Sequence, residues 1–128
     1  MSKSILIVDD EPHIRLLLQQ TLEQLEDHDV EIATASNGGD ALRIIREDRP
    51  AIVLLDVMMP VLNGFEVCKA VKADPALRGT FVVMLTAKGQ ELDRATGAEV
   101  GADLYLTKPF DPDDVLARVA KVLGVELG

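Results

Sequence analysis

Residues 5–12 read Ile-Leu-Ile-Val-Asp-Asp-Glu-Pro, an apolar run that ends in adjacent carboxylates at Asp9 and Asp10. An apolar run without alternating polar positions is typical of a strand that helices cover on both faces of a parallel sheet. Pro12 suits the first turn of a helix, because that position needs no backbone N–H donor. This stretch therefore predicts a buried parallel strand that passes directly into a helix.

Three later apolar runs are also followed by polar residues. These are 52–55 followed by Asp56, 81–85 followed by Thr86, and 104–106 followed closely by Lys108 and Pro109. In an open parallel sheet the carboxyl ends of the strands lie along one edge, where ligands bind. We therefore expect the acids, the hydroxyl and the cation to form one site, although they are spread over the whole chain.

Helical patterns alternate with these strands. We expect helices at about 12–25, from 37 to near 50, from 64 onward, at 90–100 and from 111 onward, and an edge strand at 30–34, where apolar and polar residues alternate. Five strands and five helices with right-handed crossovers make an α/β fold, a doubly wound three-layer αβα sandwich. We expect a single domain over residues 1–128. Gly97 weakens the helix expected at 90–100.

The first and last helices carry clear apolar stripes. At helical spacing, the residues expected to face the core are Ile14, Leu17, Leu18, Thr21, Leu22 and Leu25 in the first helix and Val115, Leu116, Val119, Val122 and Leu123 in the last. Asn37 is a good cap for the second helix, and Pro112 suits the first position of the last. Cys68 is expected in the core of the protein.

The composition argues against several classes of function. The chain has 13 Lys and Arg against 22 Asp and Glu, and its net charge of −9 opposes direct binding to nucleic acid. No apolar run approaches the roughly 20 residues that span a bilayer, and residues 1–4 lead into a strand without a signal peptide. One cysteine and two histidines build neither a disulfide nor a zinc site. We therefore expect a cytoplasmic protein without membrane contact.

The three acids expected at the sheet edge point to a bound cation. Asp9, Asp10 and Asp56 repel one another at short range, so we expect a positive group that offsets this repulsion. Mg²⁺ binds through one or two carboxylates, keeps several waters and takes a phosphate oxygen of its substrate. Lys108 adds a fixed positive charge and Thr86 a hydroxyl, so the set suits phosphoryl transfer. A carboxylate in the middle of the set could itself be the nucleophile.

Several motifs together indicate a family. They are Ile7-Val8-Asp9-Asp10-Glu11-Pro12, Leu55-Asp56-Val57-Met58-Met59-Pro60 with Gly64, Leu85-Thr86-Ala87, Gly101-Ala102-Asp103, and Tyr105-Leu106-Thr107-Lys108-Pro109-Phe110. In these motifs, and over essentially its whole length, the chain resembles the receiver domain of a two-component response regulator. The resemblance implies a flavodoxin-like five-stranded sheet with the strand order 2-1-3-4-5.

The resemblance also implies a chemical role for the acids. Asp56 would accept a phosphoryl group from the phosphohistidine of a sensor histidine kinase or a phosphotransfer protein. Asp10, Asp56 and the backbone carbonyl of Met58 would hold Mg²⁺ directly, with Asp9 acting mainly through a water. Such a receiver is a phosphoacceptor switch that assists its own phosphorylation and dephosphorylation, and not an enzyme.

A second group of residues would respond to the phosphoryl group. Lys108 would bind one phosphoryl oxygen and Thr86 another, and the ring of Tyr105 would follow Thr86 from an exposed to a buried position. The bond between Lys108 and Pro109 is expected to be cis. The fourth helix, fifth strand and fifth helix would then form the face that docks a downstream protein target or an output domain outside this chain.

Three positions concern partner choice and phosphoryl lifetime. Leu104 stands where many members of the family have a second acid, which leaves the choice of partner open. Met58 and Lys88 occupy positions that tune the access of water to the acyl phosphate in this family. We expect their substitution to change the phosphoryl lifetime more than the fold.

Three other functions compete with this interpretation. A phosphatase of the haloacid dehalogenase type would use an aspartyl nucleophile, but it needs a second acid two residues later, where this chain has Met58. A nucleotide- or flavin-binding flavodoxin-like domain would need a Gly-rich or hydroxyl-rich loop in place of residues 9–11, which would repel phosphate. A phosphorylation-independent protein-interaction module on the same fold differs from a receiver only in its activity.

Overall fold

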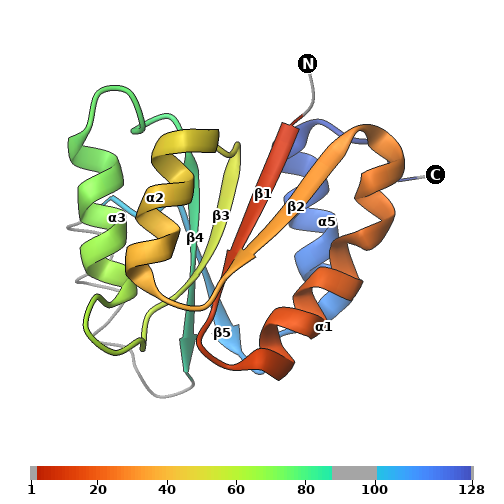
Figure 1. Cartoon of the computed structure of the whole chain (residues 1–128). Helices are drawn as coiled ribbons and strands as arrows, with labels where there is room; N and C mark the ends of the chain where they lie inside the picture. Colours follow the sequence, from red (N-terminus) through yellow and green to blue (C-terminus); the bar gives the residue numbers. More distant parts are fainter. Residues whose placement is uncertain (1–2, 88–100, 128) are drawn as a thin grey trace.

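A five-stranded parallel sheet forms the centre of the computed structural model, which describes residues 3–87 and 101–127. Its strands are β1 (Lys3–Val8), β2 (Val30–Ala35), β3 (Ile52–Asp56), β4 (Phe81–Ala87) and β5 (Leu104–Lys108). The strand order is β2-β1-β3-β4-β5, and each neighbouring pair is parallel. The expected fold class and strand order are therefore confirmed (Figure 1).

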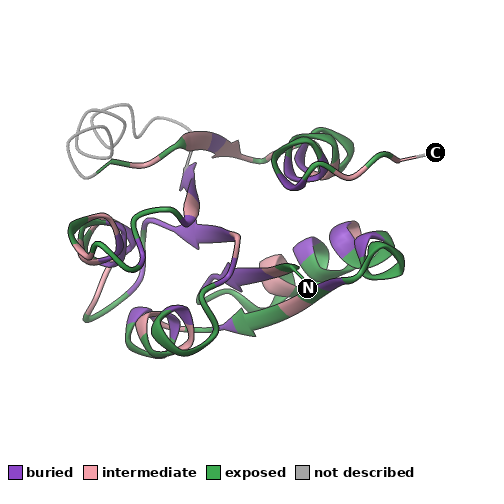
Figure 2. Ribbon diagram, turned by 90° about the horizontal axis from the view of Figure 1, so that it is seen from above, coloured by how far each residue is buried: buried purple, intermediate pink, exposed green. Residues whose placement is uncertain are grey.

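Helices cover both faces of this sheet. They are α1 (Pro12–Leu22), the short 3₁₀ helix η1 (Glu23–His28), α2 (Gly38–Asp48), α3 (Gly64–Ala73) and α5 (Pro112–Leu123). Helices α1 and α5 lie on one face, and α2 and α3 lie on the other (Figures 1 and 2). The helix expected at 90–100, with Gly97, lies outside the described residues, as does Lys88.

Side-chain caps begin three of the helices where the sequence predicts them. The Asn37 side chain accepts a hydrogen bond from the Asp40 backbone N–H at 2.8 Å, and Asp111 accepts one from Asp113 at 3.0 Å, directly before Pro112. Asn63 and Glu66 form a reciprocal capping box at the start of α3. These caps satisfy backbone donors that the first helical turn leaves without partners. They end the loops that follow β2, β3 and β5, and so fix the lengths of those loops.

Two predicted core positions are wrong, and one predicted helix is too long. Leu17 is 38% exposed and Val122 is 41% exposed. Successive residues of an α-helix are rotated by about 100° around its axis. Leu17 and Val122 therefore lie at the edge of the buried stripe of their helix, whose centre is nearer Leu18 in α1 and nearer Val119 in α5. Helix α1 ends at Leu22, and Leu25 lies in η1, where it is still fully buried.

The apolar runs are explained by two separate cores. Along β1, Ile5 and Ile7 pack towards α1 and α5, whereas Leu6 and Val8 pack towards α2 and α3. Because successive side chains of a strand point to opposite faces, both positions of the alternation are buried. The layer of buried strands between helices is visible in Figure 2.

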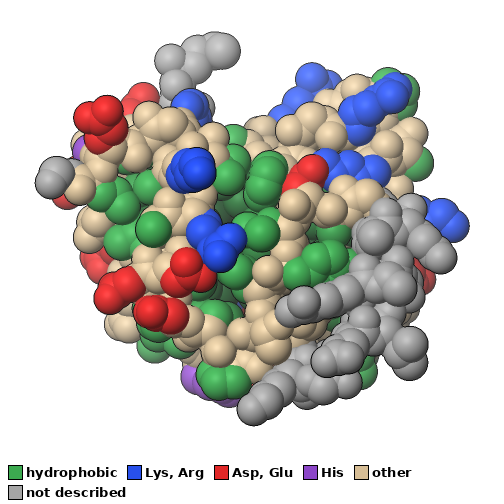
Figure 3. All heavy atoms as spheres, turned by 180° about the vertical axis from the view of Figure 1, so that it is seen from behind, with side chains coloured by type: hydrophobic (Ala, Val, Ile, Leu, Met, Phe, Trp, Pro, Cys, Tyr) green, Lys and Arg blue, Asp and Glu red, His purple; other side chains and the backbone are tan. Residues whose placement is uncertain are grey.

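Cys68 lies in the core, as the sequence predicts, and the surface carries charges of both signs. Cys68 is fully buried, and burial raises the pKa of its thiol to about 11. On the face drawn in Figure 3, basic side chains lie in separate groups with acidic side chains beside them. Within residues 3–87 and 101–127, no helix has the length and apolar character needed to cross a membrane.

Candidate functional site

The polar residues singled out in the sequence lie at the carboxyl edge of the sheet. Asp9 and Asp10 follow β1, Asp56 ends β3, Thr86 is the penultimate residue of β4, and Lys108 ends β5. The register aligns Asp56 with Leu85, the residue before Thr86, and aligns Ala87 with Lys108. Parallel strands thus bring together side chains that are up to 99 residues apart in the sequence.

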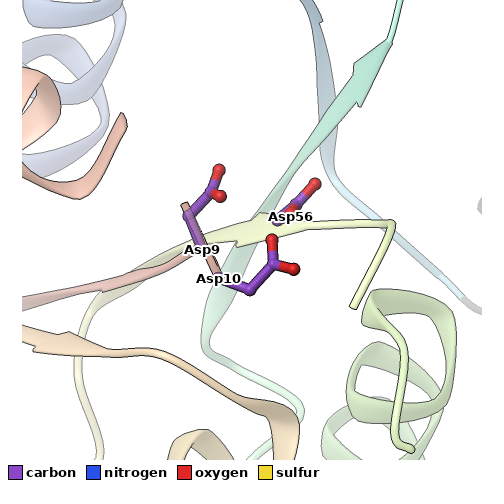
Figure 4. Close-up of side chains that lie close together, drawn as sticks. All are labelled: Asp9, Asp10 and Asp56. Atoms are coloured by element: carbon purple, nitrogen blue, oxygen red, sulfur yellow. The ribbon is translucent and has the colours of Figure 1, made fainter. Parts of the chain in front are cut away.

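Three carboxylates form the acidic part of this site. Asp9, Asp10 and Asp56 each offer an oxygen, and these oxygens all lie within 4.8 Å of one another. Figure 4 shows the three side chains around a common space at the ends of β1 and β3. Asp9 and Asp56 are 0% and 3% exposed, whereas Asp10 is exposed. The acidic pocket is therefore open on the Asp10 side and could hold a hard divalent cation.

Lys108 lies against the same acids. Its Nζ donates to Asp9 Oδ2 at 2.9 Å and to Asp56 Oδ1 at 3.3 Å, and it lies 3.7 Å from Glu11 Oε1. A single ammonium group thus faces several carboxylates, which leaves the described site with an excess of negative charge. The peptide bond between Lys108 and Pro109 is cis, as the family resemblance implied.

This charge distribution changes two pKa values. Burial and then the nearby Asp9 carboxylate raise the pKa of Asp56 to about 7, against the opposing effect of Lys108. Burial alone would lower the pKa of Lys108, but hydrogen bonds and charges from Asp9 and Asp56 raise it above its ordinary value. Both shifts have the direction expected where negative charge exceeds positive charge.

Backbone groups hold the two buried carboxylates in place. Asp9 Oδ1 accepts a hydrogen bond from the Glu11 N–H at 2.9 Å, and Asp56 Oδ1 accepts one from the Met58 N–H at 3.3 Å. Arg15 Nη1 donates to the Asp9 carbonyl at 2.6 Å and ties α1 to the end of β1. The sequence analysis missed Arg15, because its position on the helix gives no signal for a contact with a backbone carbonyl.

Gly64 allows α3 to begin directly against the end of β3. A Cβ atom at this position would lie 2.3 Å from the carbonyl oxygen of Asp56, far inside van der Waals contact. The Gly64 N–H also donates to the Val57 carbonyl at 3.0 Å. The start of α3 therefore supports the backbone of Asp56.

Comparison with known proteins agrees with this geometry. The family model of the response regulator receiver domain matches residues 5–120. The chain belongs to this family. The regulatory protein PhoP for alkaline phosphatase synthesis in Bacillus subtilis is 45% identical over 123 residues, which are 96% of this chain and 49% of PhoP. This receiver domain spans about half the length of the curated relatives that it matches first.

Solved structures resemble the receiver domain over nearly its whole length. A response regulator from Chloroflexus aurantiacus J-10-fl has a TM-score of 0.87 at 32% identity, with 97% of this chain and 99% of that chain covered. The BeF3-activated receiver domain of DrrB from Thermotoga maritima has a TM-score of 0.84 at 35% identity, with 97% and 99% covered. The chain is thus a receiver domain of two-component response regulators, a family of phosphorylation-dependent switches.

The structure places the two residues of the expected switch on one face of the sheet. Tyr105 is the register partner of Met84, and both pack on the side of α2 and α3. Thr86 lies two residues beyond Met84, so its side chain points to that same face. Thr86 is 1% exposed and Tyr105 is half-buried.

Proposed function

We propose that Asp56 accepts a phosphoryl group from a phosphohistidine in a Mg²⁺-dependent reaction. The donor is a sensor histidine kinase or a phosphotransfer protein, and residues 1–128 act as a single receiver domain. The observation that supports this proposal best is the position of Asp56 within 4.8 Å of Asp9 and Asp10, in contact with Lys108. A buried carboxylate among these groups is a candidate nucleophile, and the Lys108 ammonium is available for the incoming oxygens.

The reaction conserves atoms and charge as follows. One oxygen of the Asp56 carboxylate attacks phosphorus, and the bond between phosphorus and the imidazole nitrogen breaks. The electron pair of that bond leaves with the imidazole of the donor, and an acyl phosphate forms on Asp56. The protein is then a phosphoacceptor that assists its own phosphorylation and dephosphorylation, and no turnover of a separate substrate is required.

The residues of the site fit a resident Mg²⁺ ion. We assign direct ligation to Asp10, Asp56 and the carbonyl of Met58, with Asp9 acting through a water. The exposed Asp10 carboxylate and the excess negative charge suit a cation that keeps part of its hydration shell. When bound, the ion supplies the positive charge that brings the acids and the phosphoryl oxygens together.

The switch would start from Lys108 and Thr86. In this proposal Lys108 Nζ moves part of its contact from the acids to a phosphoryl oxygen, Thr86 donates to another, and Tyr105 follows Thr86 inward. Since β5 carries Tyr105 and precedes α5, the change alters the face formed by the fourth helix, β5 and α5. A protein target or an output domain would dock on this face, although the fourth helix lies outside the described residues.

The proposal also covers location and excluded partners. The single cysteine, Cys68, is buried and has no second cysteine to pair with in this chain, which is compatible with a reducing compartment, and we propose the cytoplasm. The net charge of −9 opposes direct binding of this chain to nucleic acid. Its partners are therefore proposed to be proteins.

Intact mass after incubation with acetyl phosphate tests the function. We expect one phosphoryl group to be added in the presence of Mg²⁺, none in its absence, and none in Asp56→Asn. Asp27→Asn serves as the matched control, because Asp27 is an exposed aspartate of η1, which precedes β2 and so lies at the amino edge of the sheet, opposite the site. A folded wild type that gains no mass at saturating Mg²⁺ would instead indicate a phosphorylation-independent interaction module.

A further inference from the structure

Strand β2 forms one edge of the sheet and, within the described residues, pairs only with β1 (Figure 1). The outward N–H and C=O groups of an edge strand can pair with another chain, so proteins commonly protect such an edge with lysine, proline or a bulge. The register of β2 with β1 runs from Val30 to Ala35 without a bulge. These residues include neither lysine nor proline, and Glu31 is their only charged side chain. The β2 edge is thus open to a further strand.

Helix α2 leaves the amino half of β2 uncovered. The side chain of Ala35, at the end of β2, is buried on the side of α2 and α3. Ala33 and Glu31 point to the same side, because side chains alternate along a strand, but both are exposed. Their register partners on β1 are Leu6 and Ser4. A groove of about 620 Å³ lies here, between β2 and the second half of α2.

The groove combines apolar residues with exposed acids. Leu6 and Pro50 are buried in it, and Ile44 is half-buried. Its exposed acids are Glu31, Glu47 and Asp48. Among the described residues no Lys or Arg lines the groove, and Arg43 Nη1 only approaches Glu47 Oε2 to 3.5 Å in an exposed pair of little strength. The groove therefore suits a partner that carries both cationic and apolar groups.

A second acidic hollow lacks the other features of this groove. It has a volume of about 550 Å³ and lies over the end of α1 and η1. Its lining residues are Gln20, Glu23, Gln24, Glu26 and Asp27. It offers as many carboxylates as the groove, but it has no apolar lining and no strand edge. The two hollows therefore separate the effect of acidic charge from the effect of the sheet edge.

We infer that the groove binds an extended basic segment of a partner protein, which adds to β2 as a further strand. Main-chain hydrogen bonds give affinity in this mode of binding, and alternate side chains give specificity. Lys or Arg side chains of the segment would meet the three carboxylates, and their alkyl chains would cover Ile44. The side chains between them would point to the other face, beside the half-buried Ile32.

Charge decides between this occupant and two others. A second copy of the chain would bring the same edge, the same acids and a further net charge of −9. A nucleic acid would bring phosphates against the carboxylates. A basic protein segment alone offsets the acids of the groove. The inference does not rest on phosphoryl transfer to Asp56, because the groove lies at the amino half of β2 and the site at the carboxyl edge of the sheet.

The experiment measures the binding of a designed peptide to matched variants. The probe is a capped, fluorescent peptide in which Lys and Val alternate, and binding is followed by fluorescence anisotropy at low salt. A second probe has the same sequence but carries N-methyl groups on its inner residues, which remove its main-chain donors. The groove variant combines Glu31→Gln, Glu47→Gln and Asp48→Asn. The control variant combines Glu23→Gln, Glu26→Gln and Asp27→Asn, and so removes the same amount of charge from the second hollow.

We expect the groove variant to bind the alternating peptide about tenfold more weakly than the wild type, because exposed ion pairs each contribute modestly. The control variant should lose less than about twofold, through its lower net charge alone. The N-methylated peptide should bind at least about tenfold more weakly to the wild type, because strand pairing needs its main-chain donors. In NMR spectra, the amide signals of residues 30–35 should shift on addition of the alternating peptide.

Equal losses in the two variants would overturn the inference, since attraction to the net charge would then explain the binding. Full affinity of the N-methylated peptide would also overturn it, because the segment would not be paired with β2. The same holds if the alternating peptide does not bind to the wild type. Dimers of the protein alone that pair through β2, detected by analytical ultracentrifugation and by NMR shifts of residues 30–35, would identify a second copy as the occupant instead.

Discussion

Two lysine–aspartate clusters lie at opposite ends of the sheet and differ in charge balance. At the amino ends of β4 and β5, Lys72 Nζ donates to Asp103 Oδ2 at 2.8 Å. The same ammonium donates to the carbonyls of Thr80 at 2.7 Å and Arg78 at 3.1 Å. Asp103 Oδ2 also accepts from the Val82 N–H at 2.8 Å. One positive charge meets one negative charge here, and backbone groups complete the set.

The cluster at the carboxyl ends is unbalanced. Lys108 faces Asp9 and Asp56 directly, and Asp10 lies within the same acidic group. Since buried charge that is not neutralised costs stability, folding alone gives no reason to keep the additional acids. The balanced cluster joins α3 to β4 and β5, whereas the unbalanced one could hold a cation.

Replacing Lys108 should have the largest effect on stability and should depend on divalent ions. In Lys108→Met without divalent ions, the buried Asp9 carboxylate loses its cation, and the free energy of unfolding should fall by about 3 kcal/mol. Saturating Mg²⁺ should restore most of that loss, because the ion supplies the missing positive charge. Urea unfolding followed by circular dichroism, with EDTA or with Mg²⁺, measures both values. A loss that Mg²⁺ does not reduce would remove the distinction between the clusters.

Replacing Lys72 should have a smaller effect on stability, and this effect should not depend on divalent ions. Lys72→Met keeps the alkyl chain but leaves Asp103 and two backbone carbonyls without their donor, so the free energy of unfolding should fall by about 1–2 kcal/mol. The same urea titration applies, and the loss should be equal in EDTA and in Mg²⁺. Recovery in Mg²⁺ would show that this cluster also responds to the ion.

Replacing Asp56 should have an effect on stability of the opposite sign. The unfolded carboxyl releases its proton near its ordinary pKa of 3.8, whereas the folded one releases it near 7. Between these values the folded state holds more protons, so the stability contributed by this group is present below pH 4 and is lost as pH rises towards 7.

The Asp56→Asn variant has no carboxyl group at this position and should not lose stability between pH 4 and pH 7 for this reason. Without divalent ions its advantage over the wild type should grow from nothing near pH 4 to a plateau above pH 7. Unfolding titrations over this pH range measure the difference. Saturating Mg²⁺ should reduce or reverse it, since the wild type gains more from the ion. An advantage that is constant across the range would contradict the assigned cause.

The sequence predicts that these side chains lie together because strand ends are local signals. Each of Asp9, Asp56 and Lys108 follows an apolar run, and the parallel arrangement then brings them to one edge whatever their separation in the chain. The helix starts at Asn37 and Pro112 are equally local, since capping depends on the next two or three residues. These features could be predicted without any long-range contact.

Other features depend on contacts that the sequence does not show. Lys72 and Asp103 are 31 residues apart, and neither follows an apolar run that would mark it. The exposure of Val122 depends on how α5 rotates against the sheet, which the helical period alone does not determine. The positive φ of Val61 is imposed by the packing of α2 and α3 around its loop, against the preference of valine itself.

Gly64 sets a limit on how this protein can evolve. The hydrogen atom of a glycine is all that fits between the first turn of α3 and the carbonyl oxygen of Asp56. Any other residue would push the helix away from the strand end that carries Asp56. Exposed positions of α3 can therefore change without moving Asp56, whereas position 64 cannot.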